Sequence, residues 1–180
     1  MVIDIGTGDG RAVLARARAT PCDLVLGIDA AAASMREASR RAAARPARGG
    51  LANARFFVEA AEALPGPLAG TADLVTITMP WGSLLRGVLG RDTAVMTGIA
   101  GLLAAEGSIE LLVSVTARDA VDGIATLSAD DAPTIAAAWS RFGLRLVTFQ
   151  PAMTEEIVAT GSSWARRLGE RPVWRLELHP

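Results

Sequence analysis

The chain is poor in the residues that most often carry metal binding and hydrolytic chemistry. Among its 180 residues there is one cysteine, Cys22, and one histidine, His179, which lies next to the chain end. A single cysteine forms no intrachain disulfide and no cysteine metal site, and one terminal histidine argues against zinc hydrolase and Ser/His/Asp chemistry. The sequence therefore predicts no bound metal and points away from the common hydrolases.

Two further absences concern location and partners. No stretch of about 18 residues is free of charged and turn residues, and the N-terminus is rich in glycine and aspartate where a signal peptide would be basic and then apolar. We therefore expect a cytoplasmic protein without membrane contact. Lysine is missing altogether, so all 18 basic residues are arginine, and the net charge is −1. A near-neutral chain is not a general nucleic-acid binder, although a local basic patch is compatible with this charge.

Apolar runs of strand length alternate along the chain with longer segments of helical pattern. The predicted strands cover residues 2–5, 24–29, 55–58, 73–78, 109–115, 144–149 and 173–178. The predicted helices cover residues 9–19, 30–44, 92–107, 133–142 and a patch at 162–168, with Asp92 as an N-cap and Gly107 as a stop signal. This alternation is typical of an α/β fold with a mostly parallel sheet and helices on both faces. The length fits a single domain spanning residues 1–180.

The segment "DIGTGDG", residues Asp4–Gly10, runs from the first predicted strand through a glycine turn into the first helix. Gly6, Gly8 and Gly10 allow positive φ and let a ligand approach the backbone closely. The spacing is G-x-G-x-G, and Arg11 stands where a dinucleotide fingerprint has its third glycine. The turn therefore departs from the pattern of a dinucleotide site.

The acidic residues of this turn, Asp4 and Asp9, disfavour a phosphate because they would repel it. S-adenosylmethionine (AdoMet) fits better, since it has no phosphate and its amino group and sulfonium suit acids. Asp29, at the end of the second strand, suits the ribose hydroxyls, and Glu62 stands just past the third strand, where such folds contact the adenine. The alternatives are a turn that only packs a helix on a strand, an aspartate that only caps a helix, and a solvent-exposed glutamate.

The motif "TMPWGSLLRG" follows the fourth strand and places Pro80 and Trp81 where α/β proteins build their active sites. AdoMet enzymes that methylate exocyclic amines carry an Asn/Asp-Pro-Pro-aromatic motif here, but no acid or amide precedes this proline. A ring nitrogen with its own lone pair, such as adenine N1, chiefly needs to be positioned. We expect Trp81 and Trp164 to grip a base drawn from its stack, an interaction of about 1–3 kcal/mol per stacked base. The alternative for both is core packing, which we expect for Trp139 and Trp174.

Arginines gather in two parts of the sequence and recur after the fifth strand. They are Arg36, Arg40, Arg41, Arg45 and Arg48 on the second predicted helix and its linker, Arg166, Arg167 and Arg171 around Trp164, and Arg118. Guanidinium groups pair well with phosphates, so clusters beside an aromatic clamp indicate contact with an RNA backbone. For any single arginine, a solvated helix face is the alternative.

Five segments together, "DIGTGDGR", "GID", "AAEALP", "TMPWGSLLRG" and "SSWARRLG", resemble the aminoglycoside-resistance 16S rRNA (adenine-1408, N1) methyltransferases, the kanamycin–apramycin resistance group. The resemblance implies a class I AdoMet-dependent methyltransferase with a Rossmann-like sheet of seven strands, mostly parallel with one antiparallel strand. It also implies methylation of N1 of a decoding-site adenine in the assembled 30S subunit. The added methyl group and its charge would block aminoglycoside docking and so give resistance.

The resemblance further implies roles for individual residues. The AdoMet site would comprise Asp4, Gly6, Thr7, Gly8, Gly10, Asp29, Ala61, Glu62 and Pro80, with Asp29 holding the ribose and Ala61 and Glu62 the adenine. Trp81 and Trp164 would sandwich the flipped target base, and Ser162 would help to position that loop. The rRNA would contact Arg41, Arg45, Arg48, Arg118, Arg167 and Arg171.

Members of this group carry a short N-terminal extension before the first strand, whereas here Met1 stands directly on that strand. We therefore expect the AdoMet loop to be intact and part of the RNA-docking surface to be missing. Two alternatives to an rRNA enzyme remain open. One is a small-molecule AdoMet methyltransferase with a closed pocket, and the other is a non-catalytic module that binds AdoMet or the ribosome. A monomer is the expectation for an enzyme that must reach into a ribosome.

Overall fold

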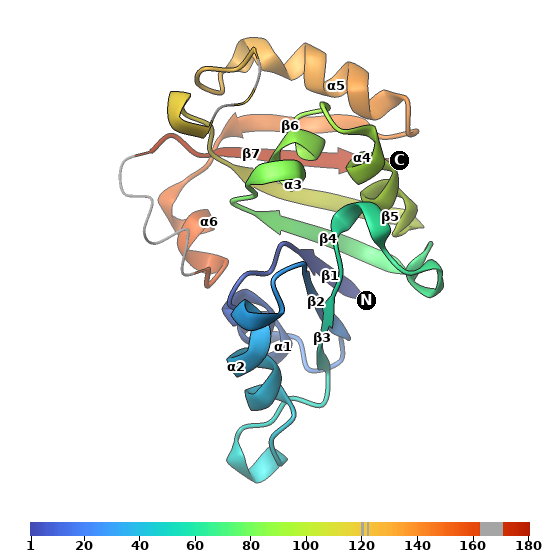
Figure 1. The fold of residues 1–180 in the computed structure, drawn as a ribbon, viewed down its shortest axis with the longest axis vertical. Coiled ribbons are helices and arrows are strands. Elements are labelled where there is room, and N and C mark those ends of the chain that lie inside the picture. The colour runs from blue at the N-terminus through green and yellow to red at the C-terminus, as the bar shows by residue number, and fades with distance from the viewer. Residues whose placement is uncertain (120, 122, 163–170) are drawn as a thin grey trace.

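The computed structural model describes residues 1–119, 121, 123–162 and 171–180. Within these residues the centre is one seven-stranded sheet with the strand order β3-β2-β1-β4-β5-β7-β6 (Figure 1). Its strands are β1 (Val2–Ile5), β2 (Val25–Asp29), β3 (Ala54–Val58), β4 (Ala72–Thr78), β5 (Leu103–Val113), β6 (Arg145–Pro151) and β7 (Trp174–His179). β7 runs antiparallel to β5 and β6, and the other neighbouring strands are parallel. The predicted mostly parallel sheet with one antiparallel strand is confirmed.

Helices cover both faces of this sheet, as predicted. One face carries α1 (Arg11–Ala19) and α2 (Ala32–Ala42), whose buried residues pack on β1, β2 and β3. The other face carries α3 (Gly82–Val88), α4 (Thr93–Gly101) and α5 (Ala132–Ser140). The short α6 (Thr154–Ala159) lines a pocket together with α1. None of the helices in the described ranges is long and apolar enough to cross a membrane.

Side-chain alternation along β1 assigns its residues to the two faces. Ile3 and Ile5 join the larger core under α3, α4 and α5, whereas Val2 packs with α1 and α2. Because successive side chains of a strand point to opposite faces, Asp4 points to the same side as Val2. The acid of the glycine motif is thereby placed on the α1 side of the sheet.

Trp139 belongs to the core, as the sequence predicts, and Trp174 is partly buried and packs against that core. Trp139 is fully buried, and its indole N–H donates to the Val88 carbonyl oxygen at 3.1 Å. Trp174 packs against Phe149 with 4.9 Å between ring centroids. A buried indole that finds an acceptor for its N–H is a stable core element.

The segment after Asp92 differs from the prediction. Asp92 caps α4, but the helix ends at Gly101 and β5 already begins at Leu103. The register between β4 and β5 shifts beside Ala72, and a Cβ on Gly107 would lie 2.5 Å from the Ala72 carbonyl oxygen. Gly107 therefore allows two backbones to approach at a β-bulge and does not end a helix.

Two helices, α3 and α6, were not predicted. α3 begins directly after Trp81 and contains glycine at both ends of its length, Gly82 and Gly87, which weakens any helical signal in the sequence. α6 has six residues, too few to establish a periodic pattern. The predicted helical patch at 162–168 lies outside the described residues from 163 onward.

Candidate cofactor and target-base site

The glycine turn after β1 lies at the carboxyl edge of the parallel strands, where open α/β sheets bind ligands. Gly6, Gly8 and Gly10 have φ of +70°, +57° and +71°. A Cβ on Gly6 would lie 2.6 Å from Leu84, and one on Gly10 would lie 2.6 Å from Ala38, so both glycines are needed for packing. In contrast, a Cβ on Gly8 would meet no atom of another described residue within 4 Å, apart from the two chain neighbours of Gly8. Gly8 is therefore where a ligand can approach the backbone.

Asp29 stands beside this turn, as predicted. Its Oδ2 accepts a hydrogen bond from the Gly8 amide at 2.8 Å, and its Oδ1 accepts one from the Ala31 amide at 2.7 Å. The two bonds fix the orientation of the carboxylate, and each oxygen keeps a lone pair for a further donor. The N-cap residue of α2 is Ala31, so Asp29 is not merely a helix cap. A fixed carboxylate next to an open glycine fits the vicinal hydroxyls of a ribose.

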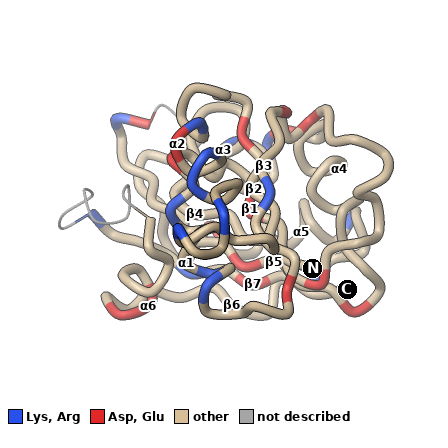
Figure 2. Tube along the Cα trace, turned by 90° about the horizontal axis from the view of Figure 1, so that it is seen from below, with Lys and Arg blue, Asp and Glu red and all other residues tan. Residues whose placement is uncertain are grey.

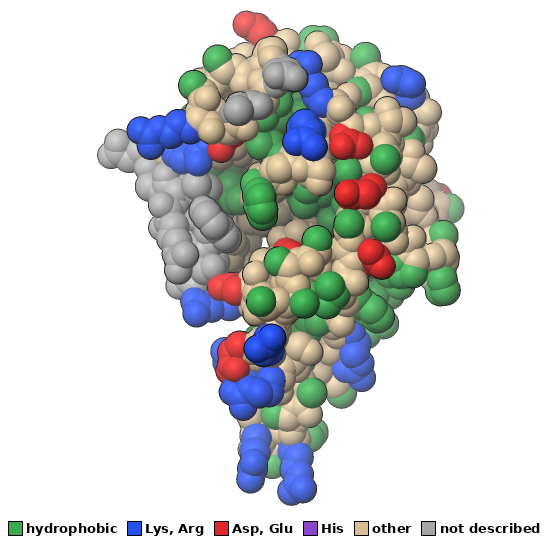
Figure 3. Space-filling model, viewed as in Figure 1, with side chains coloured by type: hydrophobic (Ala, Val, Ile, Leu, Met, Phe, Trp, Pro, Cys, Tyr) green, Lys and Arg blue, Asp and Glu red, His purple; other side chains and the backbone are tan. Residues whose placement is uncertain are grey.

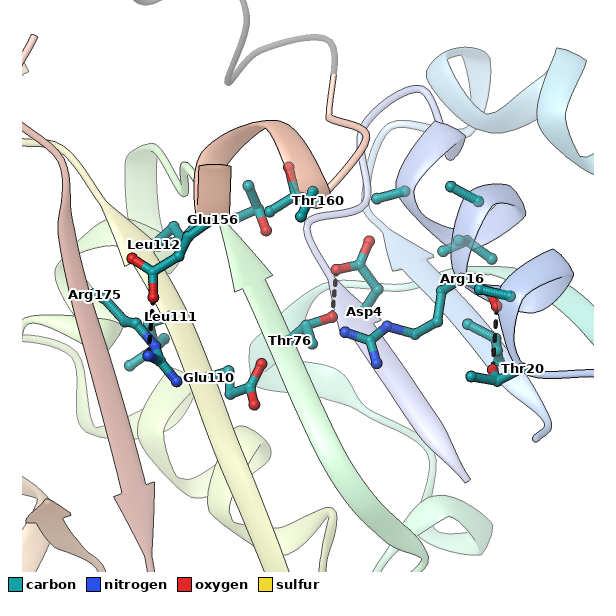
Figure 4. A pocket seen from close by; sticks show the side chains of 17 residues that line it. Asp4, Arg16, Thr20, Thr76, Glu110, Leu111, Leu112, Glu156, Thr160 and Arg175 are labelled. Atoms are coloured by element: carbon teal, nitrogen blue, oxygen red, sulfur yellow. Dashed lines mark hydrogen bonds and ion pairs between the residues drawn. The ribbon is translucent and has the colours of Figure 1, made fainter. Parts of the chain in front are cut away.

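Asp4 is buried at the wall of a pocket of about 410 Å³ between α1 and α6 (Figure 4). Its Oδ1 accepts a hydrogen bond from the Thr76 hydroxyl at 2.7 Å, and Arg16 lines the same pocket. Burial raises the pKa of the Asp4 carboxyl, although the hydroxyls of Thr7 and Thr76 and the charge of Arg16 act in the opposite direction. The side chain is thus a partly compensated buried acid, which suits a cationic ligand group. Thr76 was not singled out by sequence reasoning, because strand pairing alone brings it to Asp4.

Ala61 and Glu62 lie in the 3₁₀ turn η2 (Ala61–Ala63) beyond β3. Ala61 is buried and Glu62 is exposed. A Cβ on Gly98 of α4 would overlap the Ala61 carbonyl oxygen, so the turn packs directly against the α4 backbone. Close packing therefore fixes the backbone at Ala61, while the Glu62 carboxylate remains accessible.

The turn after β4 carries the tryptophan motif in an unusual backbone conformation. Met79 has φ +53° and is, among the described residues, the one non-glycine residue with positive φ. Its amide donates to the Leu112 carbonyl oxygen at 2.8 Å, which holds the strained turn in place. Such a conformation costs about 1–3 kcal/mol and persists where the surroundings fix it. Pro80 is buried beyond this residue, and Trp81 is 79% exposed, so Trp81 is not a core residue.

Part of the predicted base site lies outside the described residues. Ser162 is described, and its amide donates to the Thr160 hydroxyl at 3.1 Å. Trp164 and Arg167 fall in the range 163–170, which the structure does not describe. The two predicted faces of the clamp are therefore not placed relative to each other.

Most of the described arginines predicted to contact RNA are exposed. Arg41, Arg45 and Arg48 lie at the end of α2 and in η1 (Pro46–Arg48), where basic side chains gather at the tip of the molecule (Figure 3). Seen from that tip, arginine positions gather around α1 and α2 (Figure 2). Arg118 is exposed in η4 (Ala117–Asp119). Arg171 differs, because it is partly buried and its guanidinium is paired within the protein.

The strand order with an antiparallel β7, the glycine turn after β1 and the carboxylate at the end of β2 define a class I AdoMet-dependent methyltransferase. A model of the family described as "NpmA: 16S rRNA (adenine(1408)-N(1))-methyltransferase" matches residues 1–173. The chain belongs to this family.

Individual relatives agree in sequence and in structure. A 16S rRNA (adenine(1408)-N(1))-methyltransferase from Streptoalloteichus hindustanus is 36% identical over 173 residues, covering 93% of this chain and 80% of the relative. The crystal structure of the 16S rRNA methyltransferase KamB superposes with a TM-score of 0.90 at 34% identity, covering 99% of this chain and 87% of KamB. A tryptophan-to-alanine mutant of the 16S rRNA (adenine(1408)-N(1))-methyltransferase from Catenulisporales acidiphilia, with cosubstrate SAM (AdoMet), gives a TM-score of 0.83 at 30% identity, covering 99% and 84% of the two chains.

Proposed function

We propose that this protein transfers the methyl group of AdoMet to N1 of adenine 1408 of 16S rRNA in the 30S subunit, and so confers aminoglycoside resistance. The observation that carries the proposal is Trp81, an exposed indole held by a strained turn at the carboxyl edge of the sheet. Membership of the family supports the same target. A cytoplasmic monomer with a single domain over residues 1–180 fits this role.

In the proposed AdoMet site, the open backbone at Gly8 and the oriented carboxylate of Asp29 hold the ribose. Asp4 attracts the cationic methionine end, and Ala61 and Glu62 border the adenine, with Pro80 closing the site beside them. Gly6, Thr7 and Gly10 shape the turn. Bound AdoMet would supply a methyl group on a sulfonium. The N1 lone pair of the target adenine would attack that methyl carbon in line, and the sulfur–methyl bond would break to release S-adenosylhomocysteine. No general base is required, since N1 carries no proton to remove.

For the target base, Trp81 provides one stacking face and Trp164 the other, with Ser162 positioning the second. Stacking by an aromatic side chain contributes about 1–3 kcal/mol per base and offsets part of the cost of drawing the base from its stack. The role of these residues is to place N1 in line with the methyl group, which is the main contribution a protein makes to such a transfer.

Arg41, Arg45 and Arg48 dock the exposed tip on rRNA phosphates, and Arg118 and Arg167 add further RNA contacts. Replacing Arg41, Arg45 and Arg48 together by alanine is expected to raise the KM for 30S subunits about tenfold at moderate salt. Loss of three phosphate contacts should reduce the slope of log KM against log salt by about two to three. Methylation rates at several salt concentrations measure this slope. An unchanged slope would show that the tip does not contact the rRNA. Replacing Arg145, which is exposed on β6, by alanine gives the control.

The direct test of the function is methyl transfer from radiolabelled AdoMet to purified 30S subunits, with naked 16S rRNA in parallel and primer extension to locate the product. We expect incorporation into subunits and a stop of reverse transcription at adenine 1408, because an N1-methyl group blocks base pairing. Transfer to a small molecule but not to subunits would favour a small-molecule methyltransferase. AdoMet binding without any transfer would favour a non-catalytic module.

A further inference from the structure

The pocket between α1 and α6 is lined by two arginines, and they differ in how they are paired. Arg175 forms ion pairs with Glu156 and with Glu177. Arg16 is half-buried, and among the described residues no carboxylate forms an ion pair with it, although its charge acts on Asp4. Arg16 therefore keeps guanidinium donors available for a further acceptor in this pocket.

The helix α1 gives the Arg16 side chain room on the pocket side. The face of α1 that lines the pocket carries Arg16 and three small residues, Ala12, Ala15 and Ala19, which recur at helical spacing. Figure 4 shows the Arg16 side chain extending from α1 toward Asp4 on β1. A guanidinium and a buried carboxylate thus face the same space without being joined in an ion pair.

Two neighbouring groups of opposite charge match a ligand that itself carries both charges. The methionine end of AdoMet has an α-ammonium and an α-carboxylate on one carbon atom. In the placement proposed above, Asp4 attracts the ammonium, so the carboxylate must lie close by. Asp4 and Glu110, which also lines the pocket, would repel this carboxylate if it had no cationic partner. A guanidinium binds a carboxylate through two parallel hydrogen bonds and is suited to that role.

We propose that Arg16 binds the α-carboxylate of the methionine end of AdoMet. The proposal rests on the proposed placement of that end at Asp4. Sequence reasoning did not single out Arg16, because the segment "RARA" on α1 resembles a solvated helix face. The competing role for Arg16 is to compensate the charge of Asp4 without contacting the ligand.

A ligand without the carboxylate separates the two roles. Decarboxylated AdoMet keeps the adenosine, the sulfonium and the amine. Calorimetric titration of both ligands into wild type and Arg16→Gln forms a double-mutant cycle between the side chain and the ligand group. We expect Arg16→Gln to weaken AdoMet binding about tenfold, the effect of losing one charge-assisted interaction. Decarboxylated AdoMet should bind as in wild type or more tightly, because the Asp4 charge is then less compensated.

Two further variants control for charge and shape. Arg18→Gln removes the same charge from an exposed position of the same helix that does not line the pocket, and should change neither Kd. Arg16→Lys keeps the charge but not the planar fork, and should recover part of the AdoMet affinity. Retained binding of decarboxylated AdoMet shows that Arg16→Gln is folded.

Two outcomes would contradict the role of Arg16. An equal loss of affinity for both ligands would show that Arg16 supports the shape of the site and does not contact the carboxylate. Unchanged affinity for AdoMet would show that another group binds the carboxylate. Asp4→Asn, titrated in the same series, tests the placement separately. If it binds both ligands as tightly as wild type, the methionine end does not lie at Asp4, and the proposed cofactor placement is wrong.

Discussion

Replacing Trp81 by alanine is expected to lower kcat/KM for methylation of 30S subunits about 100-fold and to leave the Kd for AdoMet within about threefold. Loss of one stacking face removes up to about 3 kcal/mol, and each 1.4 kcal/mol is a factor of ten. Because the indole is 79% exposed, truncation leaves no cavity in the core and should not change the Tm. Single-turnover methylation and calorimetric titration of AdoMet measure the two quantities.

Two further variants make this result specific. Trp81→Phe retains an aromatic face and should recover most of the activity that Trp81→Ala loses. Phe57→Ala truncates another exposed aromatic side chain, 42% exposed on the edge strand β3, and should leave methylation unchanged. If Trp81→Ala weakens AdoMet binding as strongly as it weakens methylation, Trp81 belongs to the cofactor site and the stacking role is wrong.

The sequence was informative where function depends on short local patterns. The strand, glycine turn and helix around Gly6, Gly8 and Gly10 form as predicted, and Asp29 lies next to Gly8. Both features follow from chain direction in parallel β-α units, which brings the ends of neighbouring strands to one edge. Strand and helix periodicity similarly sufficed to predict all seven strands of the described sheet.

Contacts between distant segments could not be predicted in the same way. Arg171 and Asp119 form an ion pair although they lie 52 positions apart in the sequence. In the sequence, an arginine at position 171 is equally compatible with docking on RNA and with an internal ion pair. Gly107 resembles a helix stop signal in the sequence. In the structure, glycine is needed at this position because the backbone of the neighbouring strand leaves no room for a Cβ. The strained conformation of Met79 has no sequence signal, since glycine is the residue that usually marks positive φ.

Replacing Asp4 by asparagine is expected to weaken AdoMet binding roughly 10- to 100-fold, because a charge-assisted interaction with the cationic methionine end contributes about 1.5–3 kcal/mol. Asparagine has nearly the same shape, and its amide oxygen can still accept the hydrogen bond from Thr76. Asp9→Asn, at a half-exposed position of the same turn where Arg11 already compensates the charge, is the matched control and should change the Kd little. Calorimetric titration with AdoMet compares the three proteins.

The same substitution should stabilise the protein when no AdoMet is bound. Burial raises the pKa of Asp4 in the folded state, so over the range between its unfolded and folded pKa the native protein holds a proton that the unfolded chain has released. Stability contributed by this residue therefore falls as pH rises through that range, and above it the native state carries the full cost of a buried charge. Asp4→Asn removes this cost, so its Tm should exceed that of wild type at pH 8, and the difference should shrink as the pH is lowered. If Asp4→Asn is less stable than wild type at pH 8, the charge of Asp4 stabilises the fold. The presence of an acid at this position would then be explained by stability and not by cofactor binding.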